Sequence, residues 1–267
     1  MKLLLTNDDG VYSVGIQTMA KRLAEAGHDL LVVAPDRERS GAGHSMTLAR
    51  PVYLRDADKR LFCGDIPAKA CDGTPTDCIS MGIDVLGFDA DMVISGINQG
   101  PNLADDITYS GTVCAAMEGL IFGRPSLAVS LVSSSKHREI HNETAAAALM
   151  GLMEWISKEP MPEGVLYNVN VPNLPLSELK GVRVTRKGIR RYVDKIKTVK
   201  SPSGEETYWI GGHIDDVLED DTDVNAVKEG YVSVTPIQLD MTCFRTFERD
   251  RRGPMARTLS DFLRKQA

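Results

Sequence analysis

Several common signals are missing from this chain of 267 residues. Its five cysteines are an odd number without a CxxC pair, so we expect neither a disulfide framework nor a zinc ribbon. No run of 18 or more apolar residues occurs, which predicts that nothing spans a membrane. Met1 leads directly into an apolar segment, so we expect no signal peptide and a cytoplasmic protein. The cysteines are Cys63, Cys71, Cys78, Cys114 and Cys243.

Signals for several large function classes are missing as well. A net charge of −6 argues against a nucleic-acid polymer as partner, because such proteins usually carry a basic domain. The chain has no GxxxxGK[ST] phosphate loop and no GxSxG nucleophile elbow. Gly41-Ala42-Gly43 is only a fragment of the GxGxxG dinucleotide motif.

Strand and helix patterns alternate along the first two-thirds of the chain. Short apolar runs at 2–5, 30–34 and 92–94 predict buried strands, and further strands are expected at 127–132 and, from its alternating pattern, at 166–171. Apolar residues at helical spacing predict helices at 16–26, 75–86, 113–121 and 149–156, and a short β section is expected within 52–65. This alternation predicts an α/β fold with three layers, in which a Rossmann-like, doubly wound and mostly parallel sheet lies between helices.

The character of the sequence changes after about residue 180. Residues 183–200 are basic, residues 215–223 are acidic, 231–237 alternates as a strand, and a final helix begins near Ala256. We therefore expect a catalytic core at 1–180 and a β-rich extension at 181–267. The extension would contain a β arm, a returning strand and a C-terminal helix, and we expect it to make oligomer contacts. A solvated face is the simpler interpretation of the basic segment.

Two adjacent aspartates, Asp8 and Asp9, follow directly after the first predicted strand. The carboxyl end of a strand is where open α/β sheets bind ligands. Neighbouring carboxylates repel each other and resist desolvation, and a divalent cation relieves both problems. The alternative is that Asp8 caps the following helix and that Asp9 is solvated.

Two further strands end in polar loops, which contain Ser40 and Asn98. The carboxyl ends of parallel strands share one edge of the sheet, so these side chains are expected near Asp8 and Asp9. All of these side chains offer oxygen ligands, which favour Mg²⁺, Mn²⁺ or Ca²⁺ over zinc.

The segment Tyr109-Ser110-Gly111-Thr112 leads into a predicted helix and could bind an anion with free amides and a hydroxyl. Simple helix capping is the commoner use of this pattern. Arg39 could clamp a phosphate or be a solvated loop residue. His44 could donate a proton or lie exposed in its glycine-rich loop.

Five motifs in this order resemble those of the SurE (survival protein E) family, and the resemblance covers nearly the whole chain. The motifs are Asn7-Asp8-Asp9-Gly10, Arg39-Ser40-Gly41, Gly73-Thr74-Pro75-Thr76-Asp77, Ser95-Gly96-Ile97-Asn98 with Gly100-Pro101-Asn102, and Tyr109-Ser110-Gly111-Thr112. One difference is that Glu38 and Gly43 stand where a typical member has Asn and Ser.

The resemblance implies a metal-dependent 5′-nucleotidase that acts on nucleoside monophosphates. Family members also act on 3′-nucleotides, and some act on short polyphosphate. It implies one divalent metal ion per subunit, Mg²⁺ or Mn²⁺, held by Asp8, Asp9, Ser40 and Asn98. It also implies a homodimer or homotetramer.

Our hypothesis for the reaction is hydrolysis of a phosphate monoester with Asp8, Asp9 and Asn98 as catalytic residues. Asp8 or Asp9 accepts a proton from water or orients it, and Asn98 positions the metal. Asn102, Ser110, Gly111 and Thr112 bind the phosphate, and Arg39 and His44 are candidate substrate contacts.

Three rival interpretations differ in what they require. A haloacid-dehalogenase phosphatase needs a nucleophilic aspartate where this chain has Asn7, and an amide is a poor nucleophile. A nucleotide or phosphate sensor would bind its ligand around a structural metal without turnover. An oligomeric scaffold has only the basic 183–200 segment in its favour.

Overall fold

The computed structural model describes residues 1–62, 66–133, 139–193, 196–251 and 253–266. Cys63 and residues 194–195 of the basic segment therefore lie outside the described residues. The chain divides into two compact units, Met1–Ile237 and Gln238–Ala267.

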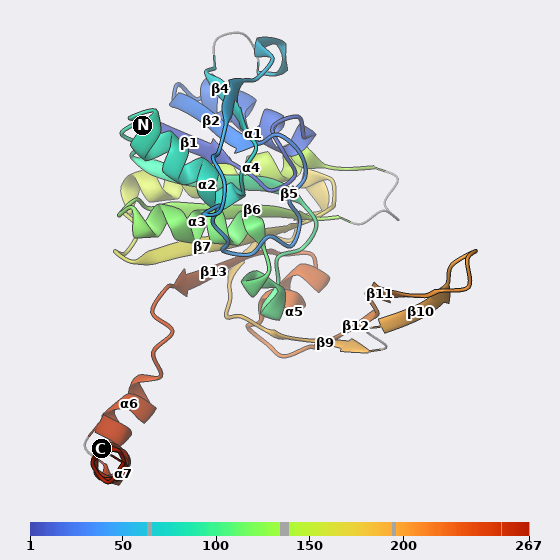
Figure 1. Cartoon of the computed structure of the whole chain (residues 1–267). Helices are drawn as coiled ribbons and strands as arrows, with labels where there is room; N and C mark the ends of the chain where they lie inside the picture. The colour runs from blue at the N-terminus through green and yellow to red at the C-terminus, as the bar shows by residue number, and fades with distance from the viewer. Residues whose placement is uncertain (63–65, 134–138, 194–195, 252, 267) are drawn as a thin grey trace. The chain divides into compact units, whose positions relative to one another are not determined.

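A nine-stranded sheet forms the centre of the first unit (Figure 1). Its strand order is β3-β4-β2-β1-β5-β6-β7-β13-β8, with β3 antiparallel to β4 and with β1 parallel to both β2 and β5. The strands are β1 (Lys2–Thr6), β2 (Asp29–Pro35), β3 (Leu54–Asp56), β4 (Ala68–Cys71), β5 (Met92–Gln99), β6 (Ser126–Val132), β7 (Val165–Pro172), β8 (Val182–Val184) and β13 (Val232–Gln238). The order reverses between β1 and β5, and a doubly wound sheet binds ligands at such a reversal.

Helices cover both faces of the sheet because consecutive side chains of a strand point to opposite faces. Leu3 and Leu5 of β1 lie in the core with Ile16 of α1, whereas Leu4 packs with Ile79 of α2. Helix α1 packs against α4, and α2 packs against α3. The helices are α1 (Val14–Glu25), α2 (Pro75–Ser80), α3 (Gly111–Ile121), α4 (Asn142–Lys158), α5 (Asp223–Lys228), α6 (Phe244–Arg251) and α7 (Pro254–Arg264). The predicted α/β fold is therefore confirmed.

Shorter segments make up the connections between these elements. A π-helical turn follows α2, and three short 3₁₀ helices occur in loops. These segments are η1 (Lys59–Leu61), η2 (Met81–Val85), η3 (Ala104–Thr108) and η4 (Leu176–Glu178). Segment η3 lies in the long loop between β5 and α3, which leads to the N-terminus of α3.

The structure differs from the expected elements in several places. Strand β5 continues past Ile94 to Gln99, with a register shift between Ser95 and Asn98 against β6, so Asn98 lies at the end of a strand. The expected helix at 75–86 changes to the π-helical turn at Met81. Strand β4 and helix α6 were not predicted, because short or strongly charged segments show little periodicity.

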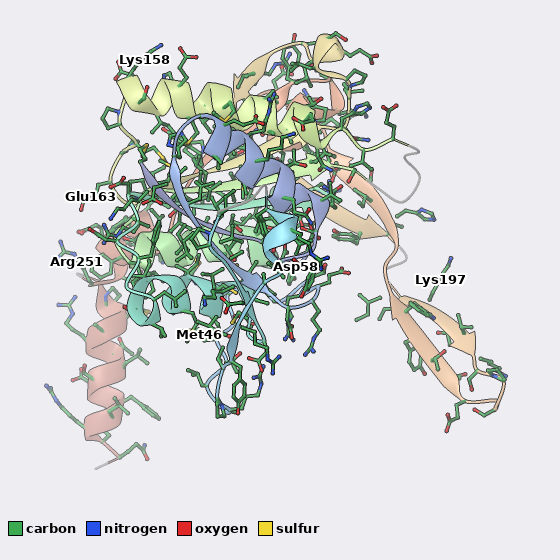
Figure 2. The ribbon with its side chains drawn as sticks, turned by 90° about the horizontal axis from the view of Figure 1, so that it is seen from above. Met46, Asp58, Lys158, Glu163, Lys197 and Arg251 are labelled. Carbon is green, nitrogen blue, oxygen red and sulfur yellow. The ribbon has the colours of Figure 1, made fainter. Side chains whose placement is uncertain are left out.

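Residues 189–217 of the extension, described except for 194–195, contain two small antiparallel pairs of strands. The pairs are β9 (Ile189–Val193) with β12 (His213–Val217), and β10 (Ile196–Lys200) with β11 (Glu206–Ile210). All residues of β10 and β11 are exposed, including Lys197, which is labelled in Figure 2. These strands lie within the expected β-rich extension.

None of the helices in the described ranges combines the length and the apolar character that crossing a membrane requires.

Candidate functional site

The site is built around a tight turn at the end of β1. The Asn7 side chain donates a hydrogen bond to the Gly10 carbonyl at 3.0 Å and accepts one from the Gly10 amide at 3.2 Å. Gly10 has a φ of +96°, a conformation that residues with a Cβ rarely adopt. Asn7 thus shapes the turn that presents Asp8 and Asp9.

Asp8 is only 4% exposed and lies against the N-terminus of α3. The Thr112 hydroxyl donates a hydrogen bond to Asp8 Oδ1. A Cβ on Gly111 would lie 2.8 Å from Asp8 Cβ, so only glycine allows this approach. Burial raises the pKa of Asp8 above its ordinary value and outweighs the hydrogen bonds from Thr112, which lower it. Asp8 does not cap α1, whose N-cap residue is Ser13.

Asp9 faces the end of β5. The Gln99 amide donates a hydrogen bond to Asp9 Oδ2 at 2.9 Å. Burial, followed by the negative charge of Asp8, raises the pKa of Asp9 to about 6. Asp9 is therefore not the freely solvated residue of the alternative interpretation.

Ser40 and Asn98, the other two predicted metal ligands, are each next in the chain to a residue that contacts these aspartates. Ser40 follows Arg39, and Asn98 precedes Gln99. The Arg39 amide donates to the Asp8 carbonyl at 2.7 Å, and the Ser40 hydroxyl donates to Glu38 Oε1 at 2.6 Å. The Asn98 side-chain nitrogen donates to the Gly100 carbonyl at 3.0 Å, so Oδ1 is the side-chain atom that could bind a metal. The sheet edge therefore gathers the loops that carry all four residues.

The donor set fits a hard divalent cation. The carboxylates of the buried Asp8 and the partly buried Asp9 have raised pKa values and need either a proton or a cation, and the neighbouring Ser40 and Asn98 add a hydroxyl and an amide oxygen. The charge of Glu38 also raises the pKa of Asp8 and of Asp9, which places a third carboxylate close by. Among the described residues, no group of three or more His, Cys, Asp and Glu is arranged to hold a metal, so the hydroxyl and the amide would be needed as ligands.

The predicted phosphate contacts lie at or near the start of α3. Ser110 is the N-cap of α3, and its hydroxyl accepts a hydrogen bond from the Val113 amide at 3.1 Å. Gly111 and Thr112 form the first turn and contact Asp8. This helix terminus and the paired carboxylates therefore belong to one site.

Asn102, the remaining predicted phosphate contact, is buried and takes part in a network of hydrogen bonds with side chains of β6 and β7. Its side-chain nitrogen donates to Ser130 Oγ at 2.8 Å, and its backbone carbonyl accepts from Asn168 at 2.8 Å and from Asn170 at 3.0 Å. Asn170 Oδ1 also accepts from the Asn102 amide at 2.9 Å. The sequence analysis missed Asn168 and Asn170 as site residues, although two asparagines within a buried strand are a signal.

Arg39 and His44 each contact the protein itself. Arg39 donates to the Asp72 carbonyl at 2.5 Å and lies 3.7 Å from Asp36 Oδ1. His44 Nε2 lies 2.8 Å from Oε2 of Glu118, a residue of α3 that is only 6% exposed. Glu118 was also missed, and its signal was a charged residue on an otherwise apolar helix. These contacts fix the glycine-rich loop against α3 and the 72–74 loop.

A polar pocket of about 570 Å³ opens beside Ser40. It is lined by Glu38, Arg39, Ser40, Gly41, Ala42, Ser45 and Thr74. A larger apolar groove of about 1020 Å³ between α4 and β8 contains none of the predicted site residues. We assign the polar pocket to the candidate site because it borders a predicted metal ligand.

Known proteins resemble this chain over most of its length. The family model described as survival protein SurE matches residues 3–194. A relative named 5′-nucleotidase SurE from Cyanothece sp. is 47% identical over 253 residues, which are 91% of this chain and 92% of the relative. A relative named 5′/3′-nucleotidase SurE from Salmonella paratyphi B is 50% identical over 244 residues, which are 91% of this chain and 92% of that relative.

A solved structure extends this similarity to the fold. The crystal structure of the SurE protein from Aquifex aeolicus has 40% sequence identity and a TM-score of 0.79, and the match covers 93% of this chain and 97% of that one. With the matched family model spanning most of the core that carries Asp8, Asp9, Ser40 and Asn98, the chain belongs to the SurE family.

Proposed function

We propose that this chain is a metal-dependent 5′-nucleotidase that hydrolyses nucleoside 5′-monophosphates to nucleoside and phosphate. The names of its relatives, 5′-nucleotidase and 5′/3′-nucleotidase SurE, support this activity. The structural observation that carries the proposal is the buried Asp8 carboxylate against the N-terminus of α3, next to Asp9, whose pKa is also raised. A site of this kind binds a cation and an anion side by side, as a metal-assisted phosphatase must.

Asp8, Asp9, Ser40 and Asn98 would hold one Mg²⁺ or Mn²⁺ ion. When bound, the ion would neutralise phosphate charge and make a bound water more acidic. Asp9, the more exposed of the two aspartates, would accept a proton from water or orient it. Thr112 holds the Asp8 carboxylate in place through its hydroxyl.

The phosphate is held by the N-terminus of α3. The first N–H groups of a helix lack partners within the helix, and the helix dipole favours an anion at this end. Gly111 is the first residue of α3, and its lack of a side chain lets Asp8 lie close to this helix terminus, so the metal and the phosphate would be neighbours. The polar pocket beside Ser40 receives the nucleoside, with Arg39 and His44 on the loop that borders it. The same phosphate site would accept 3′-nucleotides and short polyphosphate.

Phosphate release from a panel of nucleoside monophosphates, with and without Mg²⁺ or Mn²⁺, tests the proposal. We expect release by the wild-type protein only with metal, and none by Asp9→Asn. Metal and nucleotide binding without release by the wild-type protein would overturn the enzyme and favour a sensor.

We also propose that the second unit contributes to a homodimer or homotetramer. Apolar residues of α7 recur at helical spacing and are 52–67% exposed, which is costly in water. These residues are Met255, Leu259, Phe262 and Leu263. Light scattering should give a multiple of the chain mass for the wild-type protein and a smaller mass for Phe262→Glu. A wild-type monomer would contradict the proposal.

A further inference from the structure

The loop that links β5 to the phosphate-binding end of α3 is fastened to the extension. This loop contains η3, which lies between Asn102 and Ser110. Ala104 in η3 has a φ of +52°, and its amide donates to Asp223 Oδ2 at 2.8 Å. The other oxygen of Asp223 accepts from the Gly188 amide at 2.8 Å. One buried carboxylate thus joins the loop to the start of the β arm.

Arg190 of β9 makes the second connection, through a pair of carboxylates. Its Nη1 donates to Asp106 Oδ2 in η3 at 2.8 Å. Its Nε and Nη2 donate to the two oxygens of Asp216 in β12 at 2.8 Å and 2.9 Å. The Arg190 side chain is only 4% exposed, so little water reaches its guanidinium. The guanidinium charge therefore neutralises the carboxylates of Asp106 and Asp216.

Neighbouring side chains reinforce this connection. The Tyr192 hydroxyl donates to the Asp106 carboxylate at 2.6 Å. Burial and this hydrogen bond raise the pKa of Tyr192 to about 12. Asp105 accepts from the Arg190 amide at 3.1 Å and pairs with Lys187. The basic segment, whose role the sequence left open, therefore contacts the acidic residues of η3.

We propose that Arg190 is a positioning residue for the phosphate site, which it serves by holding η3 so that the N-terminus of α3 stays in place. This inference rests on the proposed function, because it assigns the phosphate to Ser110, Gly111 and Thr112. Segment η3 ends at Thr108, two residues before Ser110, and the Tyr109 carbonyl accepts from the Gly43 amide at 3.1 Å. A shift of η3 would therefore move both the start of α3 and the glycine-rich loop.

The physical argument is that the arrangement depends on charge neutralisation. Removing one partner of a buried ion pair leaves an uncompensated charge, and the structure rearranges to hydrate it. Without Arg190, Asp106 and Asp216 would repel each other across β9, and η3 would lose its fixed position. Arginine is needed because lysine cannot bind two carboxylates with a planar fork of donors.

The test compares Arg190→Met, Arg190→Lys and Asp106→Asn with Arg191→Met in the full-length protein. Arg191 is the neighbouring arginine on β9, and it is exposed, so Arg191→Met is a matched control. Titration calorimetry with inorganic phosphate and Mg²⁺, together with kinetics on one nucleoside monophosphate, gives the readouts. We expect Arg190→Met to weaken phosphate binding and raise KM by about tenfold, with kcat within about threefold, because positioning for binding is lost.

Hydrogen exchange of the amides at 104–112 provides a readout that does not depend on activity. We expect faster exchange there in Arg190→Met, an intermediate rate in Arg190→Lys and the wild-type rate in Arg191→Met. Asp106→Asn keeps the shape of the side chain and tests the same contact if Arg190→Met does not fold. In a folded variant, unchanged phosphate affinity together with unchanged exchange would overturn the inference.

The two proposals fail in different ways. A wild-type protein that neither binds nor releases phosphate would overturn the proposed function, and with it the phosphate role of Arg190. A wild-type protein that does both, with Arg190→Met indistinguishable from it, would overturn the positioning role alone.

Discussion

Two pairs of adjacent aspartates, Asp8-Asp9 and Asp105-Asp106, both precede α3 in the chain and have opposite surroundings. The pKa of Asp8 is raised and that of Asp9 is raised to about 6, mainly by burial. The pKa of Asp105 is lowered, mainly by its hydrogen bond with Lys187. Asp106 is paired with Arg190. Burial thus disfavours the charged form of the dipeptide in one place, and cationic side chains neutralise it in the other.

The difference shows how the structure separates a binding site from a structural contact. A bound cation stabilises carboxylates whose charged form is otherwise disfavoured, so such carboxylates are suited to bind a cation. Carboxylates that already have a cationic partner gain little from another cation and serve to connect elements. The four predictions below test whether this contrast holds.

The largest effect is expected on catalysis. Asp9→Asn should lower kcat/KM for a nucleoside monophosphate by at least about a hundredfold, because a metal ligand and a proton acceptor are lost together. Asp105→Asn should change it by less than about threefold, since an amide oxygen still accepts from the Arg190 amide. Steady-state kinetics with saturating Mn²⁺ would measure both. Equal losses in the two variants would remove the contrast.

Metal binding should stabilise the protein through the first pair alone. At a Mn²⁺ concentration of 100 times Kd, the free energy of unfolding should rise by about 2.7 kcal/mol. This gain should persist in Asp105→Asn and disappear in Asp9→Asn. Urea denaturation at pH 7.5, with Mn²⁺ or with a chelator, is the measurement. A gain that survives in Asp9→Asn would place the metal elsewhere.

The pH dependence of stability should have opposite signs for the two pairs. The pKa of Asp9 is about 6 in the folded protein and 3.8 in the unfolded chain, so the folded state binds more protons between these values. The free energy of unfolding therefore falls as pH rises from about 4 to 6. Asp105 has a lowered pKa, so its contribution is present above its unfolded value of 3.8 and is lost as pH falls below it. In chelator, denaturation of Asp9→Asn should show a smaller decline from pH 4 to 6.

For Asp105→Asn we expect a smaller loss of stability on acidification below pH 4, and no change in the decline from pH 4 to 6. The reverse assignment of these two slopes would contradict the environments described for the two pairs.

The smallest effect concerns the glycine beside Asp8. Gly111→Ala would place a Cβ 2.8 Å from Asp8 Cβ, and the displaced carboxylate should lower kcat/KM by about tenfold. Gly151 of α4 is a matched helical control, since nothing lies within 4 Å of its missing Cβ. Gly151→Ala should leave activity unchanged and add about 0.5–1 kcal/mol to stability. Unchanged activity in Gly111→Ala would show that Asp8 tolerates displacement.

Much of the fold and the centre of the site could be predicted from local patterns. The apolar runs identified the buried strands of the parallel core, and Asn7-Asp8-Asp9-Gly10 stood out because it follows such a run. The continuation of β5 to Gln99 could not be predicted, because Gly96 and Asn98 are unfavourable in strands. Beyond the register shift that contains Gly96, Asn98 pairs with Ser130 of β6. Strand β4 was missed because four residues are too few to show a period.

Side-chain partners were the least predictable part of the site. Thr112 and Ser110 were expected to face a phosphate, whereas the structure shows one bound to Asp8 and the other capping α3. Arg39 and His44 were expected at the substrate, and the structure shows their bonds to Asp72 and Glu118. Their roles toward substrate stay predictions. Partners that lie more than 30 residues away leave no local signal.

The sequence by itself determined the α/β alternation, the polar strand ends and the family to which the motifs belong. These follow from short-range rules of burial, periodicity and turn chemistry, which act over a few neighbouring residues. Only the tertiary structure decided which aspartates are neutralised by cationic side chains and which have pKa values raised by burial. That outcome depends on burial and on cations such as Arg190, which is 84 residues from Asp106 in the chain, and only folding brings such groups together.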